Sequence, residues 1–566
     1  MVVVEYKNDC IHLHVPFEQK SRAQKLGAKW DAKSKTWYFA FDLKLWRAIE
    51  MEFGDELVVS PVFRMLLVRK RHAEEEFLEA KRIAERDDPV EFEVKGISLE
   101  GKNPFYNYQK HGVKCGLAVG DGFLIGDVMG LGKSIQALGL AVERRNNGDV
   151  SNCLIVCPAS LKYNWLQEIH KFTKESVLVI DGAPADRAQK WIAAGYFFKV
   201  VNYETIAIDL FWDAKKKGVD RRIAGYQSIL TGFDMIVVDE IQALKHGTSL
   251  RSKAMKQFRT KYRVGLSGTP IDGKLEELHS IFEFLKPGLF PSHAKFMERY
   301  AVTNYFKAVV GYKNVDEVKE KIEPYYLRRL KHVVLKDLPE KIYKDVFVEL
   351  SNKEMKLYKD LIKKKNEVTS EAMAATVVLR ARQFCDFPEI LDMRNPSAKF
   401  AALDELLQEL IGQNNEKVII FTQYKQALDL IYKNLKSSYK ILQIHGGVGS
   451  KERLDLVNEF NNDKSVNIIL MTDAGCSGLN LQEAHHVIHY EDNFSPATMQ
   501  QRNDRAHRAT TKHTVTIWRF QVLGTIEEHV RKILDKKMQV TNKMLNESNT
   551  EFSVETLSNT QLIELL

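Results

Sequence analysis

The chain has 566 residues, which at roughly 150 residues per domain suggests roughly three to four domains. Its 83 basic and 75 acidic residues leave a formal net charge of +8, which permits a nucleic-acid partner without requiring one. With 44% hydrophobic residues the chain is too apolar to be disordered. We expect no secretory signal and no membrane span. The six Cys are scattered without zinc spacing, so we expect reduced thiols in a cytosolic-type protein.

Residues 1–60 are expected to form a separate small α+β unit, because short alternating runs there predict strands around one short helix. The unit contains three of the seven tryptophans: Trp30, Trp37 and Trp46. Between Lys20 and Lys35 six basic residues stand against one acid, Asp31. Two interpretations stay open. The large side chains build the core of a small domain, or the basic and aromatic side chains hold phosphates and stack on unpaired bases at a DNA junction.

Residues 61–100 are expected to be a helical linker, since they are rich in helix formers. Short apolar runs then alternate with helical stretches over 101–290 and again over 396–540, which is typical of parallel sheets covered by helices. The intervening 291–395 is charged and aromatic, and we expect a mostly helical insertion without comparable strands. Residues 541–566 are expected to form a tail. The predicted fold class is α/β, with two parallel-sheet domains, the insertion and the N-terminal unit.

The segment FLIGDVMGLGKSIQALGLA is the strongest functional signal. An apolar strand leads into a loop in which Gly130 and Gly132 let backbone N–H groups approach phosphate oxygens, and a helix starts at Lys133. Lys133 would bind the β- and γ-phosphates, and Ser134 would ligate Mg²⁺. The strict phosphate-loop pattern has Gly where this chain has Asp127, so the motif alone is also compatible with an ordinary glycine-rich turn.

Three further segments support a nucleotide site. The strand MIVVDE ends in Asp239, which would hold Mg²⁺, and Glu240, which would polarise the attacking water. The cluster SGTP at 267–270 lies at the sheet edge where open α/β folds bind ligands. In the second domain, Arg505 and Arg508 share a predicted helical face and would stabilise charge on the transferred phosphoryl group. Each of these segments alone is also compatible with a non-functional role: solvated acids, an ordinary turn or a solvated basic helix face. Their occurrence together, after a phosphate loop, indicates ATP chemistry.

The order of these motifs resembles that of the superfamily-2 helicases, and the details resemble the Swi/Snf-related double-stranded-DNA translocases, over about residues 101–540. GDVMGLGKS is similar to that family's DEMGLGKT. DEIQ stands where the family has a DEAH-like box, so Gln242 replaces His, which puts the interdomain coupling of that position in doubt. LRRLKHVVLKDLPEK, KVIIFTQY, TDAGCSGLN and QQRNDRAHR follow in family order. The compact chain and VPFEQKSRAQKLGAKWDAKSKTWYF are similar to the annealing helicases with a HARP-type accessory domain, and the architecture suits bacterial or phage proteins.

The resemblance implies two RecA-like domains with ATP and Mg²⁺ in the cleft between them. Gln109 would read adenine, and Phe105 or Tyr106 would stack on it. Asp127 stands where the family regularly has Asp, within the nucleotide loop, and Gln501 would face the nucleotide from the second domain. The DNA-facing loops would contact phosphates, since translocation is independent of sequence. The residues expected there are Pro158, Ser160, Lys162, Tyr203, Thr422, Thr472, Gly475 and Asn480.

The function predicted is ATP-dependent translocation on duplex or branched DNA, in fork or junction remodelling or strand annealing during replication, repair or recombination. One alternative is a strand-separating DNA or RNA helicase on the same core. The other is a nucleotide-gated DNA-binding module without turnover, which the presence of Lys133, Glu240 and both arginines disfavours. The expected location is the cytoplasm of a bacterial or phage-infected cell, or its nucleoid. The sequence does not identify protein partners and does not determine the translocation polarity.

Overall fold

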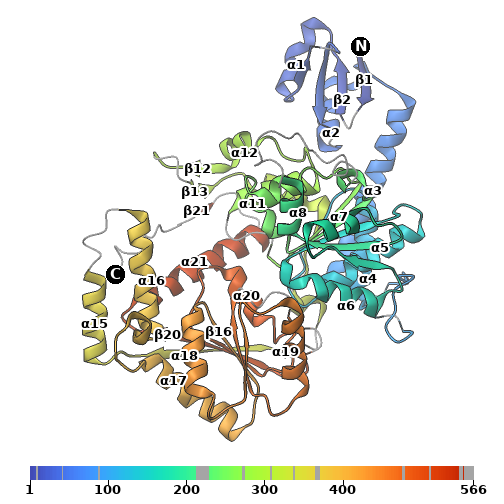
Figure 1. Ribbon diagram of the computed structural model, residues 1–566. Helices are drawn as coiled ribbons and strands as arrows, with labels where there is room; N and C mark the ends of the chain where they lie inside the picture. The colour runs from blue at the N-terminus through green and yellow to red at the C-terminus, as the bar shows by residue number, and fades with distance from the viewer. Residues whose placement is uncertain are drawn as a thin grey trace.

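The computed structural model describes residues 1–7, 10–32, 34–40, 43–86, 90–102, 104–211, 229–269, 274–305, 309–335, 338–363, 370–473, 479–508, 511–546 and 552–553. The described chain forms a small N-terminal unit and two α/β domains, and the long helix α3 (Pro61–Arg86) leads from the unit to the first domain (Figure 1). Within these residues no helix combines the length and apolarity that crossing a bilayer requires.

The N-terminal unit is built on a five-stranded sheet in the order β3-β4-β2-β1-β5. Alternation in β1 and β2 puts every second side chain on one buried face: Val2, Val4, Ile11 and Leu13. Trp46 fills the core beneath that face, edge-on to Phe63, with 5.1 Å between the ring centroids. The elements are β1 (Val2–Lys7), β2 (Cys10–His14), α1 (Lys20–Lys25), β3 (Lys29–Asp31), β4 (Thr36–Ala40), α2 (Leu43–Phe53) and β5 (Leu57–Val59).

The stretch predicted as a linker, 61–100, takes part in two hydrophobic cores. Near the start of α3, Phe63 and Leu67 belong to the core of the N-terminal unit. Near its end, Phe77 packs edge-on to Phe123 of the first α/β domain, with centroids 6.2 Å apart. The helix ends at Arg86, and the described residues beyond it are not helical. A domain boundary at residue 60 would therefore divide the core of the N-terminal unit, because α3 packs into that core and into the core of the first α/β domain.

The first α/β domain contains a seven-stranded, all-parallel sheet in the order β14-β6-β11-β10-β7-β9-β8. Alternate residues of β10 enter different cores, since helices cover both faces of the sheet. The strands are β6 (Phe123–Ile125), β7 (Cys153–Cys157), β8 (Val177–Val179), β9 (Phe198–Asn202), β10 (Met235–Asp239), β11 (Tyr262–Leu266) and β14 (Tyr326–Leu327). The helices are α4 (Asn107–Val119), α5 (Lys133–Asn146), α6 (Lys162–Phe172), α7 (Pro184–Ile192), α8 (Tyr203–Phe211), α10 (Leu250–Met255) and α11 (Leu275–Leu285).

The segment 291–395 was expected to be mostly helical, without apolar strands comparable to those of the two domains. The structure adds strands that this expectation did not include: β14 joins the first sheet, β15 (Lys341–Val348) joins the second, and β12 (Ala301–Thr303) and β13 (Val309–Tyr312) form a small antiparallel sheet with β21 (Phe552–Ser553). β15 escapes detection because it is a mostly solvated edge strand in which only Val348 is buried. The helices are α12 (His293–Tyr300), α13 (Val315–Ile322), α14 (Lys331–Val334), α15 (Asn352–Ile362) and α16 (Glu371–Asp386).

The second α/β domain has a six-stranded parallel sheet in the order β15-β20-β19-β16-β18-β17. Its remaining strands are β16 (Val418–Thr422), β17 (Ile441–Ile444), β18 (Ile468–Thr472), β19 (His486–His489) and β20 (Val515–Val522). Its helices are α17 (Ala398–Leu407), α18 (Lys425–Leu435), α19 (Ser450–Asn462), α20 (Pro496–Asn503) and α21 (Ile526–Asn546). The predicted α/β class with two RecA-like parallel-sheet domains is confirmed, although α21 runs past the expected end at residue 540.

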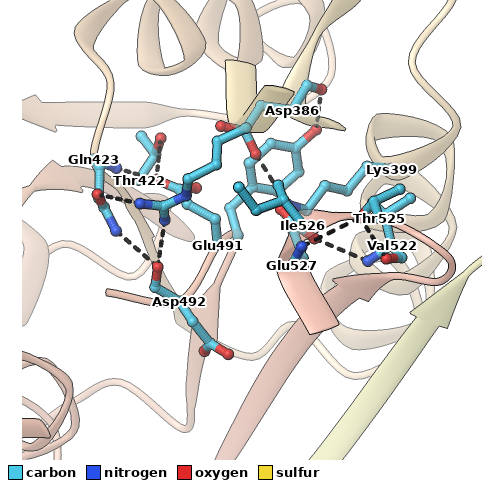
Figure 2. Close-up of polar contacts among 12 residues, drawn as sticks. Asp386, Lys399, Thr422, Gln423, Glu491, Asp492, Val522, Thr525, Ile526 and Glu527 are labelled. Atoms are coloured by element: carbon cyan, nitrogen blue, oxygen red, sulfur yellow. Dashed lines mark hydrogen bonds and ion pairs between the residues drawn. The ribbon is translucent and has the colours of Figure 1, made fainter. Parts of the chain in front are cut away.

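A buried ionic cluster ties the insertion to the second domain (Figure 2). The Lys399 ammonium is inaccessible to solvent and lies 2.9 Å from Asp386 at the end of α16 and 2.5 Å from Glu527 at the start of α21. These carboxylates raise the pKa of Lys399 well above its usual value, against the effect of burial. Three helices from separate parts of the sequence are thus joined at one charge, whose loss would leave two buried carboxylates without a cation.

Candidate functional site

The phosphate loop connects β6 to α5. It lies at the carboxyl end of β6, which stands between β14 and β11 in the first sheet. Both Gly130 and Gly132 have left-handed backbone conformations, with φ of +87° and +73°. A Cβ at Gly132 would lie 2.4 Å from Nε2 of Gln109, so a side chain has no room there. Lys133, the first residue of α5, donates a 2.9 Å hydrogen bond to the carbonyl oxygen of Asp127. The predicted strand, loop and helix are therefore arranged as a phosphate site requires.

The Asp127 carboxylate is buried in the protein interior. The expectation that its side chain binds nucleotide is therefore wrong. The carboxylate is fully buried against Arg329, which is also fully buried and whose Nε donates to it over 2.9 Å. Gln136 donates to its other oxygen over 3.0 Å. Only the backbone carbonyl of Asp127 reaches Lys133. The carboxylate serves to anchor the start of the loop, because its hydrogen-bonding capacity is used inside the protein.

An acidic pair lies at the end of β10, of which Asp239 is the last residue, and Glu240 follows it; β11 separates β10 from β6 in the sheet. Asp239 accepts hydrogen bonds from the Trp165 indole and from the backbone N–H of Glu240, both over 2.9 Å. Burial and the adjacent Glu240 raise the pKa of Asp239. Glu240 has a φ of +49°, a left-handed conformation that is costly for a residue with a Cβ and is found mainly at functional sites. Burial lowers the pKa of Lys133, while Glu240, Asp127 and Asp239 oppose that shift.

Gln242, which stands where the resembling family has His, connects two of the motifs. Its Nε2 donates to the Glu240 carboxylate over 2.5 Å, and its Oε1 accepts from the Ser267 hydroxyl over 2.8 Å. Ser267 follows β11, and its hydroxyl also accepts from the N–H of Thr269 over 3.1 Å. The amide of Gln242 thus links the acidic strand end to the serine turn, so the replacement keeps a connection at this position.

Ser134 and Glu168 form a contact that the motifs alone did not indicate. The Ser134 hydroxyl and the positive charge of Arg508 both favour the ionised form of Glu168 on α6. Burial nevertheless raises the pKa of Glu168. Trp165 lies one turn earlier on α6 and holds Asp239. Trp165 and Glu168 are three residues apart on α6, and this spacing places both side chains on the same face of the helix. The spacing was the signal in the sequence from which their shared position could have been predicted.

The second domain reaches the phosphate loop through the turn after α20. Arg505 and Arg508 both donate to the carbonyl oxygen of Leu479, over 3.4 and 2.6 Å. A Cβ at Gly130 would lie 3.3 Å from Cα of Arg508, so the turn and the loop are in contact. Nε and Nη2 of Arg505 and Nε of Arg508 are buried with no acceptor among the described residues. Burial lowers the pKa of Arg508 to about 10. Gln501 lies on α20, half-buried.

The residues expected around adenine are arranged differently from the prediction. Phe105 is 8% exposed and belongs to the core under α5, because it packs against the surface left open by Gly139. It is therefore a core residue, and the expectation that it stacks on a base is wrong. Tyr106 is 47% exposed and stacks on Tyr108. Gln109 donates to the carbonyl oxygen of Leu131 over 3.1 Å, and its own oxygen accepts from the N–H of Tyr106, so it joins α4 to the loop.

Several residues expected to contact DNA are buried and have structural partners. The Tyr203 hydroxyl donates to the carbonyl oxygen of Asp239 over 2.6 Å, beneath the acidic pair. The Thr422 hydroxyl donates to buried Glu491 over 3.0 Å (Figure 2). Thr472 is 6% exposed at the end of β18. The expected DNA contacts are wrong for the side chains of Tyr203 and Thr422, because their hydroxyls are bound inside the protein, and the Thr472 side chain is buried.

Other residues of this set lie on the surface between the two domains. Pro158 precedes a short 3-10 helix that includes Ser160 and leads to Lys162. The hydroxyl of Ser450, on the second domain, donates to the carbonyl oxygen of Ala159 over 3.1 Å. A cavity of about 480 Å³ opens beside this contact, and its lining includes Lys162, Arg187, Asn202, Ser450 and Lys451. Asn480 is exposed, whereas Gly475 lies outside the described residues.

The site is compatible with ATP and Mg²⁺. Mg²⁺ prefers oxygen ligands and is commonly held by one or two protein groups together with substrate phosphates. The Ser134 hydroxyl and the Asp239 carboxylate supply such oxygens at one sheet edge. Among the described residues, no cluster of three or more His, Cys, Asp or Glu side chains suits an all-protein metal site. A substrate-associated Mg²⁺ therefore fits the residues better than a resident structural metal.

Comparison with known proteins identifies three regions. Residues 31–391 match the SNF2-related domain, residues 398–510 match the helicase conserved C-terminal domain, and residues 11–42 match a domain of unknown function, DUF5710. The N-terminal match is thus to a domain without assigned activity, and the HARP-type likeness stays a prediction.

Individual relatives extend over most of the chain. An uncharacterized ATP-dependent helicase of Mycoplasma genitalium is 30% identical over 488 residues, which is 83% of this chain and 45% of that protein. TATA-binding protein-associated factor 172 of Homo sapiens is 27% identical, over 92% of this chain and 32% of its own length. The chain thus spans less than half the length of these relatives. The SWI2/SNF2 ATPase core of Sulfolobus solfataricus in complex with dsDNA is 26% identical, covers 84% of this chain and 97% of its own, and has a TM-score of 0.38.

Proposed function

This chain belongs to the SNF2-related family, and we propose that it is an ATP-dependent motor that translocates on DNA. One observation carries the proposal: the phosphate loop of the first domain contacts a turn of the second domain, and the two arginines of this turn have buried donors with no acceptor among the described residues. Such donors suit the charge that develops on a transferred phosphoryl group. A module that only bound nucleotide would have no need for them.

In this proposal each residue has a defined task. The N–H groups of the loop around Gly130 and the Lys133 ammonium bind the β- and γ-phosphates. Ser134 and Asp239 hold Mg²⁺, which neutralises charge on those phosphates when it is bound. Glu240 accepts the proton of the attacking water, and Gln242 orients its carboxylate through their 2.5 Å hydrogen bond. Arg505 and Arg508 complete the site when the two domains close on ATP.

The surface between the domains supports DNA as the substrate. The lining of the cavity beside the Ser450–Ala159 contact includes Lys162 of the first domain and Lys451 of the second, together with Asp181, while Arg187 is paired with Asp209. Lysines on both sides of the cavity suit a phosphate backbone, which is bound without reading its sequence. Closure and opening of the ATP cleft would move the two walls relative to each other, and this coupling is what converts hydrolysis into a step. A strand-separating DNA or RNA helicase is the alternative on the same core.

The finer proposal is that the N-terminal unit directs the motor to forks or junctions. Trp30 is 51% exposed and lies outside the core, against Trp37 with ring centroids 5.2 Å apart. Arg22 is neutralised by Glu52 and Glu56. The remaining described lysines of this region are exposed and belong to none of the ion pairs among the described residues: Lys20, Lys25, Lys29 and Lys35. An exposed indole among lysines suits an unpaired base next to phosphates.

The two levels of the proposal are tested separately. ATP hydrolysis is measured with duplex, forked, single-stranded DNA and RNA, with Lys133→Ala as the inactive control. We expect strong stimulation by duplex or forked DNA; stimulation by RNA or single strands alone would favour the helicase alternative. The Trp30→Ala variant should lower the preference for forks over duplex and leave duplex-stimulated hydrolysis intact. Met51→Ala is the matched control, since Met51 is 89% exposed in the same unit. An unchanged fork preference in Trp30→Ala would exclude the junction-binding role.

A further inference from the structure

The chain crosses from the first sheet to the second between β14, which ends at Leu327, and β15, which starts at Lys341. We call residues 328–335 together with 338–341 the interdomain segment. It includes the short helix α14 and part of LRRLKHVVLKDLPEK, which showed only as a family-like stretch in the sequence. Its charged side chains contact the start of the phosphate loop in the first domain and the arginine-bearing turn of the second domain.

The first end of the interdomain segment is attached to the phosphate loop. Arg329 is 1% exposed, and its backbone N–H and its Nε donate to the Asp127 carboxylate over 3.1 and 2.9 Å. Its Nη2 also donates to Gln136 over 2.6 Å. The start of the loop therefore cannot move without displacing Arg329 and the residues that follow it.

The other contacts of the segment are to the arginine-bearing turn of the second domain. Lys331 and Lys341 share one carboxylate, that of Asp504, over 2.8 and 2.9 Å, and Asp504 is 1% exposed. Lys331 also donates to the carbonyl oxygen of His507. The His507 ring lies 2.7 Å from the carbonyl oxygen of Pro339. Four contacts thus hold the residues on either side of Arg505 to the interdomain segment.

Besides its bond to the His507 carbonyl, Lys331 differs from Lys341 in lying beside the phosphate loop. A Cβ at Gly130 would lie 3.4 Å from Nζ of Lys331 and 3.3 Å from Cα of Arg508. The ammonium of Lys331 therefore occupies the junction of the loop, the interdomain segment and the turn. Two ammonium groups on a single carboxylate leave one positive charge uncompensated there. Burial lowers the pKa of Lys331 to about 8, while the pKa of Lys341 is raised because Asp504 and Tyr343 together outweigh the effect of burial.

We propose that Lys331 is a positioning residue, which places Arg505 and Arg508 against the phosphate loop by holding Asp504 and the carbonyl of His507. The inference rests on the ATPase function proposed above. Without Lys331 the loop and the turn would each stay attached to their own domain, and the arginines would reach the phosphates in only a fraction of closed molecules. In this proposal Lys341 balances the charge of Asp504 and has no such role, because the atoms nearest a Cβ at Gly130 belong to Lys331 and Arg508.

The test compares Lys331→Met with Lys341→Met, two substitutions that each remove one ammonium from the same carboxylate. Steady-state ATP hydrolysis with saturating DNA and equilibrium binding of a fluorescent ATP analogue separate kcat from affinity. For Lys331→Met we expect kcat to fall about tenfold or more, with analogue affinity changed by less than about threefold. For Lys341→Met we expect less than about a threefold loss of kcat. Lys331→Arg, which keeps a cation, should recover much of the rate.

A second measurement does not depend on turnover. Amide hydrogen exchange of residues 504–508 and of the phosphate loop should rise in Lys331→Met and stay close to wild type in Lys341→Met, with the melting temperature checking that each variant folds. Unchanged exchange, an unchanged kcat, or a loss of analogue affinity as large as the loss of kcat would overturn the inference; the last would make Lys331 a phosphate ligand. If the wild-type protein hydrolyses no ATP while exchange rises as expected, the proposed function fails and the attachment by Lys331 stands.

Discussion

Removal of the negative charge by Asp127→Asn should destabilise the first α/β domain strongly. The Asp127 and Arg329 side chains are both completely buried, and the carboxylate accepts from the Arg329 side chain, the Arg329 backbone N–H and Gln136. The variant leaves a buried guanidinium without its counter-charge, and breaking one partner of such a pair costs about 3–5 kcal/mol of unfolding free energy. For a domain of this size that corresponds to a melting temperature about 6–20 °C lower.

The assay is urea and thermal unfolding followed by circular dichroism, with separate transitions fitted where the two domains unfold apart. Asp121→Asn is the matched control: Asp121 pairs with Lys286 in the same domain but is 52% exposed at its side chain, so we expect a cost of about 0–1 kcal/mol. Replacement of both members by apolar residues, Asp127→Leu with Arg329→Met, should recover part of the loss. An Asp127→Asn cost no larger than that of Asp121→Asn would refute the assignment of the carboxylate as a structural anchor.

Three further outcomes are expected. Lys133→Ala should lose ATP binding, whereas Glu240→Gln should still bind ATP with Mg²⁺ and hydrolyse it slowly; wild-type turnover in Glu240→Gln would show that another group accepts the proton. Arg505→Ala and Arg508→Ala should lower kcat by up to roughly 10³-fold with ATP and DNA affinity retained, and an equal loss of DNA binding would place these side chains on DNA instead. Burial lowers the pKa of His507 from 6.5 to about 4, so the unfolded chain binds more protons between these values. Stability should therefore fall as the pH drops from 6.5 toward 4, and a His507→Asn variant whose melting temperature falls just as steeply would exclude this origin.

Corrections to the predicted site follow a common physical cause. Phe105, Tyr203 and Thr422 each stand in or beside a motif, yet each is buried with a partner inside the protein. A sequence motif indicates which residues lie near a site. Whether each side chain is exposed there depends on the helices and strands that pack over it. The Tyr203 hydroxyl donates to the carbonyl oxygen of Asp239 and the Thr422 hydroxyl to Glu491, and these partners come from distant parts of the sequence. Exposed motif residues, such as Asn480, are compatible with the predicted DNA role without being tested by the structure.

The sequence by itself determined the local parts of this protein. Glycines with φ of +87° and +73°, an apolar strand before them and a helix after them form a phosphate loop by local backbone requirements alone. Likewise a carboxylate after a buried strand must lie at the carboxyl edge of a parallel sheet, so Asp239 and Glu240 were predictable. Apolar runs were sufficient to predict most strands of both sheets, but not the short strands β8 and β14 or the solvated edge strand β15.

Only the tertiary structure decided how those parts are joined. Arg329 and Asp127 lie 202 residues apart, and Lys331 meets Asp504 across 173 residues. Within LRRLK these side chains look like ordinary surface charges, since no neighbour in the sequence reveals burial. Their partners become visible when the interdomain segment passes between two completed domains, where the low dielectric makes each buried charge depend on a specific counter-charge. The contact between the phosphate loop and the arginine turn is a property of that packing, which no single motif contains.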